Sequence, residues 1–314
     1  MTKLACVFPG QGSQSVGMLA DFRTLPAVSS LFELADNALG EPHLSTLVSD
    51  GPAESLALTT NTQPAMLVAG LACYRAWLAA GGRAADMVAG HSLGEYTALV
   101  AANVLSDEAA IRLTRIRADA MQSAVPVGVG SMAAILGLGD DVVQRVCDEA
   151  SDASKDSVVA PANFNAPAQV VIAGHADAVE RACALAKENG AKRALPLAVS
   201  APFHSALLKP AGDRLKAALE SIELKPPAVP LINNVDVAVN QAPGDIVDAL
   251  VRQAYSPVRW VECVRKMQDM GATHVIEFGP GKVLSGLVGR IDRSIKSVCV
   301  HDQASLDAAL EIFA

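Results

Sequence analysis

The segment Asp86–Tyr96 places a serine in a pattern that few folds can accommodate. It reads D-M-V-A-G-H-S-L-G-E-Y: the apolar run Met87–Ala89 has the length of a buried strand end, and the residues from Glu95 onward favour a helix. Between them, Gly90–Gly94 fits G-x-S-x-G, the pattern of a nucleophile elbow. Glycines two residues before and after the serine let the backbone turn sharply. We therefore predict that Ser92 is an exposed nucleophile at a helix N-terminus, where backbone N–H groups can hold an oxyanion.

The composition favours one large or two modest domains and argues against a nucleic-acid binder. The chain has 314 residues, of which 51% are hydrophobic and 18% charged, so it can bury a sizeable core. Its formal net charge is −8, and no Lys/Arg-rich block is present. Because phosphate contacts need a basic surface, we predict no binding of nucleic acid.

The cysteines and the apolar segments indicate a cytoplasmic protein. The six cysteines are Cys6, Cys73, Cys147, Cys183, Cys263 and Cys299, with no C-x-x-C or Cys/His ligand spacing, so we predict buried free thiols and no metal site. The first residues run into an apolar strand without the h-region of a signal peptide. The longest apolar stretch, Ala65–Leu78, is too short to span a bilayer and contains Arg75. We expect a soluble protein that does not associate with membranes.

The pattern of elements changes at about residue 130. The predicted elements there are the strand Ser131–Leu138, the helix Asp140–Ala150, the strands Val158–Ala162 and Gln169–Ala173 with a loop over 163–167, the helix Asp177–Asn189 and the strand Lys192–Val199. The order β-α-β-β-α-β is the ferredoxin-like pattern. We predict a ferredoxin-like small domain over 130–199, inserted into a larger domain.

The remaining residues, 1–129 and 200–314, alternate short apolar strands with helices. The predicted strands are Leu4–Phe8, Met87–Ala89, Val229–Asn233, His274–Phe278 and Ser297–Val300. The predicted helices are Ser29–Leu39, Asn61–Leu78 capped by Asn61 or Thr62, Ser106–Gln122, Lys209–Ile222, Ile246–Gln253, Val258–Met270 and one from Val283. Apolar strands separated by helices are typical of a parallel sheet covered on both faces. We therefore predict an α/β large domain.

Two glycine-rich segments approach phosphate-binding motifs without meeting them. After Gly10-x-Gly12, Ser15 stands where a dinucleotide fingerprint needs its third glycine. Gly281-Lys282 is followed by Val283 instead of Ser or Thr, and the upstream glycine spacing of a P-loop is missing. We predict neither site.

A serine nucleophile needs a base within hydrogen-bond reach. Among the six histidines, His91 adjoins the serine and points another way, whereas His204 lies in the turn 200–205 at the domain junction, a good place to line a cleft. No acid partner is evident, because Asp213 lies two helical turns or more beyond His204 and Asp236 is in a loop. An amide or a backbone carbonyl is the alternative partner for the imidazole.

Three arginines occur on the predicted helix 106–122. Arg112 and Arg115 share one face, while Arg117 points elsewhere. Solvated side chains are the plain interpretation of such a group. A buried Arg117 near the serine would instead capture a substrate carboxylate through two N–H groups, which would distinguish the protein from a general esterase.

Together the motifs resemble malonyl-CoA:acyl-carrier-protein transacylases and the related acyltransferase domains of polyketide and fatty-acid synthases. The resemblance covers nearly the whole chain. Besides the elbow, the motifs that carry it are Phe8–Gln14, Thr62–Ala65, Arg117 with Met121-Gln122, Asn163–Asn165, Gln169–Gly174, Pro202–Ser205, Asn233–Val235, Gln253 with Pro257, Val258 and Trp260, and Glu277–Gly281. Many motifs in one order are far more specific than G-x-S-x-G alone.

The resemblance implies a role for each matched residue. It implies that Ser92 attacks the thioester of malonyl-CoA, with His204 as general base and then acid. Backbone N–H groups of Gln11 and Leu93 are implied to form the oxyanion hole, and Arg117 to bind the malonyl carboxylate. The further implied residues are Gln63, Met121, Asn163 and Phe203 at the substrate, and Gln253 in support of His204.

The resemblance also implies a fold and partners. The fold is an α/β-hydrolase-like core with a parallel sheet and an inserted ferredoxin-like domain. The acyl group passes by ping-pong kinetics to the phosphopantetheine thiol of acyl carrier protein, with no metal and no cofactor of the enzyme's own, and the protein is expected to be a monomer. Because carrier proteins are typically acidic, docking needs a basic patch. The candidates are Lys187, Lys192, Arg193, Lys282, Arg290, Arg293 and Lys296.

Three other interpretations are compatible with parts of the sequence. A serine thioesterase would use the same elbow, with an acid partner and no carboxylate clamp. A catalytically silent domain that docks carrier proteins would not need Ser92, His204 and Arg117. A standalone acyltransferase of polyketide or malonate metabolism would share all three.

Overall fold

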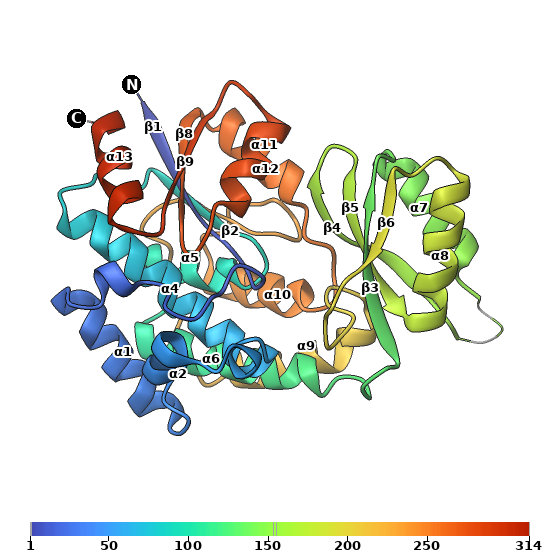
Figure 1. Cartoon of the computed structure of the whole chain (residues 1–314), viewed down its shortest axis with the longest axis horizontal. Helices are drawn as coiled ribbons and strands as arrows, with labels where there is room; N and C mark the ends of the chain where they lie inside the picture. The colour runs from blue at the N-terminus through green and yellow to red at the C-terminus, as the bar shows by residue number, and fades with distance from the viewer. Residues whose placement is uncertain (1, 153, 155, 314) are drawn as a thin grey trace.

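Two sheets organise the chain into a larger and a smaller lobe (Figure 1). The structure is a computed structural model that describes residues 2–152, 154 and 156–313. The larger lobe contains strands β1 Lys3–Phe8, β2 Met87–Gly90, β7 Leu231–Ile232, β8 Ala272–Phe278 and β9 Lys296–Val300, and helices α1 Pro26–Leu39, α2 Leu44–Asp50, α3 Ala53–Leu56, α4 Thr59–Ala79, α5 Gly94–Ala101, α6 Asp107–Gln122, α9 Lys209–Leu219, α10 Pro243–Gln253, α11 Trp260–Asp269, α12 Val283–Ile291 and α13 Gln303–Phe313, with 3-10 helices η1 Ala20–Phe22 and η3 Ala206–Leu208. The smaller lobe contains β3 Gly130–Leu136, α7 Asp140–Ala150, β4 Val159–Ala166, β5 Gln169–His175, α8 Ala176–Glu188 and β6 Arg193–Pro196.

The sheet of the larger lobe is parallel and buried on both faces. Its strand order is β7-β2-β1-β8-β9, with Val7 opposite Ala89 in β2 and Glu277 in β8. Alternate side chains of β1 enter different cores: Cys6 joins the core under α4 and α6, and Ala5 the core under α11 and α12. Because successive strand residues point to opposite faces, a strand that is apolar from Leu4 to Phe8 belongs in the centre of such a sheet.

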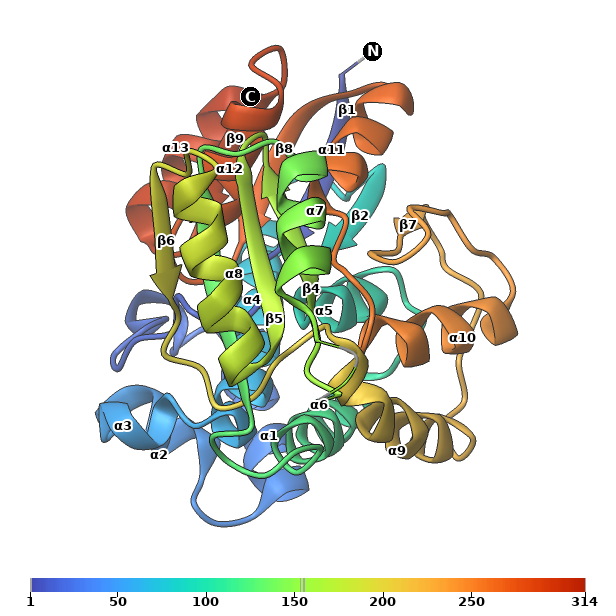
Figure 2. The same cartoon turned by 90° about the vertical axis from the view of Figure 1, so that its right-hand side faces the viewer.

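The sheet of the smaller lobe is antiparallel, with strand order β4-β5-β3-β6. One face packs against α7 and α8, which lie in front of the sheet in Figure 2. On the opposite face, Met132 and Ala173 join the core of the larger lobe. Backbone hydrogen bonds cross between the lobes, from Phe164 N–H to the Val258 carbonyl at 2.9 Å and from Val258 N–H to the Ala162 carbonyl at 2.9 Å. These contacts hold one face of the small sheet against the larger lobe.

The mixed α/β fold with a parallel and a separate antiparallel sheet is confirmed, with local corrections. The predicted loop 163–167 is wrong, because β4 runs on to Ala166 and leaves a two-residue turn before β5. The predicted caps Asn61 and Thr62 are also wrong: α4 begins at Thr59, and both side chains donate to carbonyls of α3, Asn61 to Ser55 and Thr62 to Leu56. Helices α2, α3 and α13 were not predicted.

The cysteines match a further expectation. All six cysteines are free thiols, five of them buried and Cys299 half-buried. Burial raises the pKa of Cys6, Cys73 and Cys263, so these thiols stay protonated. Over the described part of the chain, none of the helices combines the length and the apolar character that a membrane span requires.

Candidate active site

Ser92 sits on a strained turn between β2 and α5. Its φ is +53°, in the left-handed region, where a residue with a side chain is uncommon. The flanking glycines make the turn possible, since a Cβ on Gly90 would lie 1.9 Å from the Gly94 carbonyl carbon and a Cβ on Gly94 would lie 1.9 Å from the Phe8 carbonyl oxygen. The elbow therefore packs its backbone directly against β1 and presents the Ser92 side chain at the start of α5.

His204 is in direct contact with the Ser92 side chain. Ser92 Oγ and His204 Nε2 are 2.7 Å apart, and His204 Nδ1 lies 2.8 Å from the backbone carbonyl oxygen of Gln253. Since that carbonyl only accepts, Nδ1 carries the proton and Nε2 is free to accept one from the serine. The orienting group is thus a backbone carbonyl, one of the two alternatives that the sequence left open. Gln253 presents it at the C-terminal end of α10.

Arg117 reaches the serine from α6 and is buried, with 2% of its surface exposed. Its Nη2 donates to Ser92 Oγ at 3.1 Å and to Gln253 Oε1 at 3.0 Å, and Nη1 donates to Gln63 Oε1 at 2.7 Å. Arg112 instead pairs with Glu108 at the surface, at 3.0 Å. A buried guanidinium that donates hydrogen bonds to neutral side chains, as Arg117 does, can bind an anionic group.

The electrostatics of the site keep His204 neutral. Burial, and then the positive charge of Arg117, lower the pKa of His204 to about 3. Burial also lowers the pKa of the neighbouring His91. A neutral His204 can accept the serine proton at physiological pH.

These side chains meet in a small pocket between the lobes, with a volume of about 140 Å³. Its lining residues are Gly10, Gln11, Gln63, His91, Ser92, Leu93, Arg117, Met132, Asn163, Leu197, Val199, Phe203 and His204. Met132 and Asn163 come from the small lobe, the others from the elbow, from the loop after β1, from α4 and α6, and from the segment 197–204. The pocket is thus assembled from both sheets.

Comparison with known proteins places the chain in a family. Residues 5–302 match the acyl transferase domain family. The chain belongs to this family. It is 51% identical to the malonyl CoA-acyl carrier protein transacylase of Escherichia coli (strain K12) over 99% of this chain and 100% of that protein. It is 46% identical to the transacylase of the same name from Bacillus subtilis (strain 168), over 99% and 97% of the two chains. The family expected from the motifs is confirmed.

Solved structures of such acyltransferases share the whole fold. An acyl-carrier-protein S-malonyltransferase from Burkholderia pseudomallei superposes with a TM-score of 0.95 at 59% identity, covering 99% of this chain and 100% of that one. A malonyl-transacylase in complex with a type II PKS acyl-carrier protein does so with a TM-score of 0.95 at 50% identity, covering 99% and 100%.

Two of the sequence-predicted residues lie behind the pocket surface. Met121 is fully buried, and its sulfur accepts a hydrogen bond of 3.8 Å from Gln63 Nε2. Gln253 is fully buried as well, beside Arg117 and Ser92. They contact residues of the pocket instead of lining it. The other predicted residues, Gln11, Gln63, Leu93, Asn163 and Phe203 among them, line it directly.

Gln11, in the loop after β1, and Leu93, in the elbow, both line the pocket. Within residues 2–152, 154 and 156–313, neither backbone amide has a hydrogen-bond acceptor. The amide of Ser92, by contrast, donates to Asn234 Oδ1 at 2.7 Å. Free N–H groups beside a nucleophile are what an oxyanion hole provides.

Sequence reasoning missed the roles of Glu95, Asn234 and the pair His91–Asn165. His91 Nε2 lies 2.7 Å from Asn165 Oδ1, which connects the elbow to β4 of the small lobe. Glu95 and Asn234 hydrogen-bond each other and the residues around Ser92. A signal for Glu95 was available, because it is the one charged residue in the otherwise uncharged helix α5 and is buried there.

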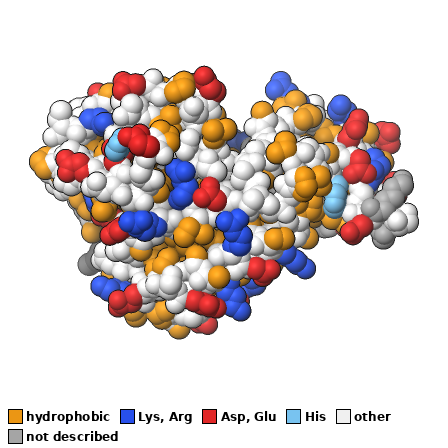
Figure 3. Space-filling model, turned by 90° about the horizontal axis from the view of Figure 1, so that it is seen from below, with side chains coloured by type: hydrophobic (Ala, Val, Ile, Leu, Met, Phe, Trp, Pro, Cys, Tyr) orange, Lys and Arg blue, Asp and Glu red, His pale blue; other side chains and the backbone are white. Residues whose placement is uncertain are grey.

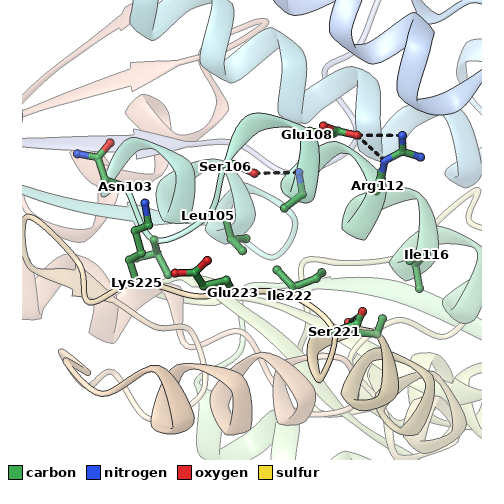
Figure 4. A pocket seen from close by; sticks show the side chains of 13 residues that line it. Asn103, Leu105, Ser106, Glu108, Arg112, Ile116, Ser221, Ile222, Glu223 and Lys225 are labelled. Carbon is green, nitrogen blue, oxygen red and sulfur yellow. Dashed lines mark hydrogen bonds and ion pairs between the residues drawn. The ribbon is translucent and has the colours of Figure 1, made fainter.

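A second hollow of the molecule lacks this chemistry. A cavity of about 760 Å³ lies between the start of α6 and the end of α9, with the Glu108–Arg112 ion pair on its wall (Figure 4). Its serines are used locally: Ser106 Oγ accepts from Ala109 N–H as the cap of α6, and Ser221 Oγ donates to the Ala218 carbonyl. No group of three or more His, Cys, Asp or Glu side chains is arranged for a metal ion in the part of the chain that the structure describes.

Proposed function

We propose that this chain transfers the malonyl group from malonyl-CoA to the phosphopantetheine thiol of acyl carrier protein through a malonyl ester on Ser92. The observation that carries the proposal is Ser92 Oγ lying 2.7 Å from His204 Nε2 and 3.1 Å from Arg117 Nη2. A nucleophile, its base and a buried cation thus converge on one atom. The names of the relatives, and the carrier protein in one related structure, support the choice of substrates.

In the first half-reaction, Ser92 Oγ attacks the thioester carbonyl while its proton passes to His204 Nε2. The carbonyl oxygen becomes an oxyanion between the N–H groups of Gln11 and Leu93. The intermediate collapses by breaking the C–S bond, and the departing thiolate of coenzyme A takes the proton from His204. General acid–base catalysis contributes on the order of 10²–10⁴-fold and one oxyanion donor about 10²–10³-fold.

The second half-reaction reverses these roles. His204 removes the proton of the carrier-protein thiol, the sulfur attacks the ester carbonyl, and Ser92 Oγ departs and recovers its proton. One thioester replaces another, so the reaction is nearly balanced in energy, and we propose that the enzyme uses no cofactor of its own.

Arg117 supplies acyl selectivity in this proposal. Its guanidinium, buried against Gln63 and Gln253, meets the malonyl carboxylate with two parallel N–H groups. This clamp distinguishes the proposed transferase from a serine thioesterase, which does not need a carboxylate on the acyl group. The orientation of His204 by a carbonyl is a second difference, because a thioesterase is expected to have an acid partner. A silent docking domain would not keep three such groups in contact.

Phe203 narrows the space next to the acyl group. It adjoins His204, lines the pocket and is 6% exposed. We propose that it crowds the position of an α-methyl group. Phe203→Ser is expected to raise the ratio of methylmalonyl to malonyl transfer by about tenfold, measured as kcat/KM for each CoA ester. An unchanged ratio would contradict the steric explanation.

The decisive experiment follows the acyl group by mass spectrometry of the intact protein. Mixed with malonyl-CoA, the protein should gain one malonyl group on Ser92 and lose it when carrier protein with its phosphopantetheine arm is added. Ser92→Ala should gain none. If the adduct is lost to water as fast without carrier protein as with it, the protein is a thioesterase. If no adduct forms, the interpretation as a catalytically silent docking domain is favoured.

The proposed function extends to the pathway that the enzyme supplies. We propose supply of malonyl groups for fatty-acid elongation in the cytoplasm, by a monomer. Polyketide assembly is the second candidate, favoured by the 50% identity to the transacylase bound to a type II PKS carrier. Transfer rates to the two kinds of carrier protein distinguish these two pathways.

For the fold, we propose an α/β-hydrolase-like domain over 1–129 and 200–314 and a ferredoxin-like domain over 130–199. The order β3-α7-β4-β5-α8-β6 supports the ferredoxin-like domain.

A further inference from the structure

A buried carboxylate that the transfer steps do not use lies beside the site. Glu95 is in the first turn of α5, three residues after Ser92, and 1% of its surface is exposed. Burying a carboxylate is costly unless its oxygens accept hydrogen bonds. Its contacts therefore indicate what it holds in place.

Glu95 holds the side-chain amide of Gln253 in one orientation. Its Oε2 accepts from Gln253 Nε2 at 2.9 Å, and the Ser92 carbonyl accepts from the same nitrogen at 2.9 Å. Gln253 Oε1 is thereby turned to Arg117, whose Nη2 donates to it at 3.0 Å. The reversed amide would set its NH₂ group against the guanidinium, and two donors cannot bond each other. Glu95 thus acts on Arg117 through Gln253.

The same oxygen also secures the elbow. Glu95 Oε2 accepts from Asn234 N–H at 3.0 Å. The Asn234 side chain accepts from Ser92 N–H at 2.7 Å and donates to the Gly90 carbonyl at 2.7 Å. One carboxylate oxygen is therefore shared by the residue that anchors the cation and the residue that holds the nucleophile's backbone.

The surroundings of Glu95 favour a role that does not depend on its charge. Facing it are Arg117 from α6, Asp236 from the loop after β7, and the thiol of Cys263 from α11. Burial raises the pKa of Glu95 to about 7, against the opposing effects of Gln253, Asn234 and Arg117. When Glu95 is protonated on Oε1, Oε2 still accepts both hydrogen bonds, so the orientation of Gln253 persists.

We propose that Glu95 is a positioning residue for acyl selectivity: by fixing the Gln253 amide, it sets the Arg117 guanidinium where it meets the carboxylate of the acyl group. The inference rests on the proposed malonyl transfer. A general weakening of the fold would reduce the acylation of Ser92 by every acyl-CoA alike. Misplacement of Arg117 reduces the reaction of acyl groups that carry a carboxylate more than the reaction of uncharged acyl groups.

The test compares acylation of Ser92 by malonyl-CoA and by acetyl-CoA in single turnovers of the wild type, Glu95→Gln and Glu95→Ala. The glutamine keeps an oxygen where Oε2 lies, so both rates should stay within about threefold of the wild type. The alanine leaves Gln253 and Asn234 without their shared acceptor. Its malonyl-to-acetyl rate ratio should fall about tenfold, which corresponds to the loss of roughly one hydrogen bond to a charged group.

A matched control is Glu277→Ala, at the other buried glutamate. Glu277 is fully buried in β8 and accepts from the N–H groups of Leu284 and Ser285 at 3.0 and 2.8 Å, at the start of α12. This change should lower the melting temperature and leave the ratio unchanged. Rates are expressed per active site, titrated with a serine-reactive fluorophosphonate, so that unfolded protein is not counted.

Two results would overturn the inference: a ratio in Glu95→Ala equal to that of the wild type, or Glu95→Gln impaired as much as Glu95→Ala. Neither depends on the outcome for the proposed function, which the wild-type protein tests by itself. If wild-type Ser92 takes up no malonyl group, the proposed function fails. If it does and the ratio is insensitive to Glu95, only the positioning role fails.

Discussion

At the scale of residues, two side chains contact Ser92 Oγ, and each is held in place by different groups. His204 contacts Ser92 Oγ through Nε2 and is oriented by the backbone carbonyl of Gln253. Arg117 contacts the same oxygen and is held by the side-chain amides of Gln63 and Gln253. Both groups are buried, so their interaction is weakly screened. The positive charge of Arg117 contributes to the low pKa of His204. In the proposed mechanism, base strength and acyl selectivity are therefore coupled.

Replacing Arg117 by alanine tests this coupling. We expect Arg117→Ala to lower malonyl transfer by about 10²-fold or more, because a bidentate charge-assisted pair is lost, while use of acetyl-CoA is kept or increased. The measurement is kcat/KM for both CoA esters. Intact malonyl transfer without gain of acetyl transfer would contradict the carboxylate role.

The pH dependence provides the second readout. In the wild type the pKa of His204 is about 3, so the neutral base persists well below the ordinary value of 6.5. We expect the acid limb of acetyl transfer, measured as kcat/KM against pH, to lie clearly below pH 6.5. In Arg117→Ala it should move upward toward 6.5, because one of the causes that lower the pKa is gone. An acid limb unmoved by the substitution would show that burial alone sets the base.

At the scale of elements, the elbow depends on close contact between the backbone of the turn and the backbone of its neighbours. The strand β2, the turn and α5 are close to β1 because Gly90 and Gly94 have no side chain. Helix α5 is buried along its length, so the turn cannot relax by moving the helix outward.

Gly94→Ala should break this arrangement. Its Cβ would lie 1.9 Å from the Phe8 carbonyl oxygen, so we expect a loss of at least about 2 kcal/mol in the free energy of unfolding and loss of Ser92 acylation. Urea denaturation measures the first and malonyl labelling the second. The matched control is Gly286→Ala in α12, where a Cβ meets nothing within 4 Å. It should be neutral or stabilising by about 0.5–1 kcal/mol. Equal effects of the two changes would contradict the packing argument.

For the whole molecule, the two lobes must meet for the pocket to exist and must leave room for a carrier protein. Seen from below, the lobes are separated by a notch, and basic side chains are interspersed with acidic ones over the surface (Figure 3). Three of the basic candidates gather at one end of the small sheet: Leu136 pairs with Arg193 and Gln169, Lys192 N–H donates to the Leu136 carbonyl, and Arg290 donates to Gln169 Oε1. We call Lys192, Arg193 and Arg290 the basic end.

Charge reversal at the basic end tests its role in docking. Lys192→Glu with Arg193→Glu should lower kcat/KM for the carrier protein by about tenfold, more at low ionic strength, because an acidic partner is steered by opposite charge. Acylation of Ser92 by malonyl-CoA should be unchanged. The control is Lys216→Glu, at an exposed position of α9. A similar loss in the control, or none in the double variant, would place docking elsewhere.

The sequence by itself determined the parts whose chemistry is local. G-x-S-x-G between an apolar run and a helix predicted the turn at Ser92 between β2 and α5. The apolar strands predicted the buried parallel sheet, and the order of elements after residue 130 predicted the second sheet. These features depend on neighbours along the chain, which a pattern records. Asn61 and Thr62 were misassigned because their partners lie in α3, a short helix without a clear periodic signal.

Only the tertiary structure decided which groups complete the site. Every residue has a backbone carbonyl, so no pattern could select that of Gln253 as the partner of His204, 49 positions away. The sequence predicted only that a helix begins near Glu95, and folding brings its carboxylate to Gln253, 158 positions away. Such hydrogen bonds exist because two sheets and their helices pack in one relative arrangement, and that arrangement is a property of the whole chain.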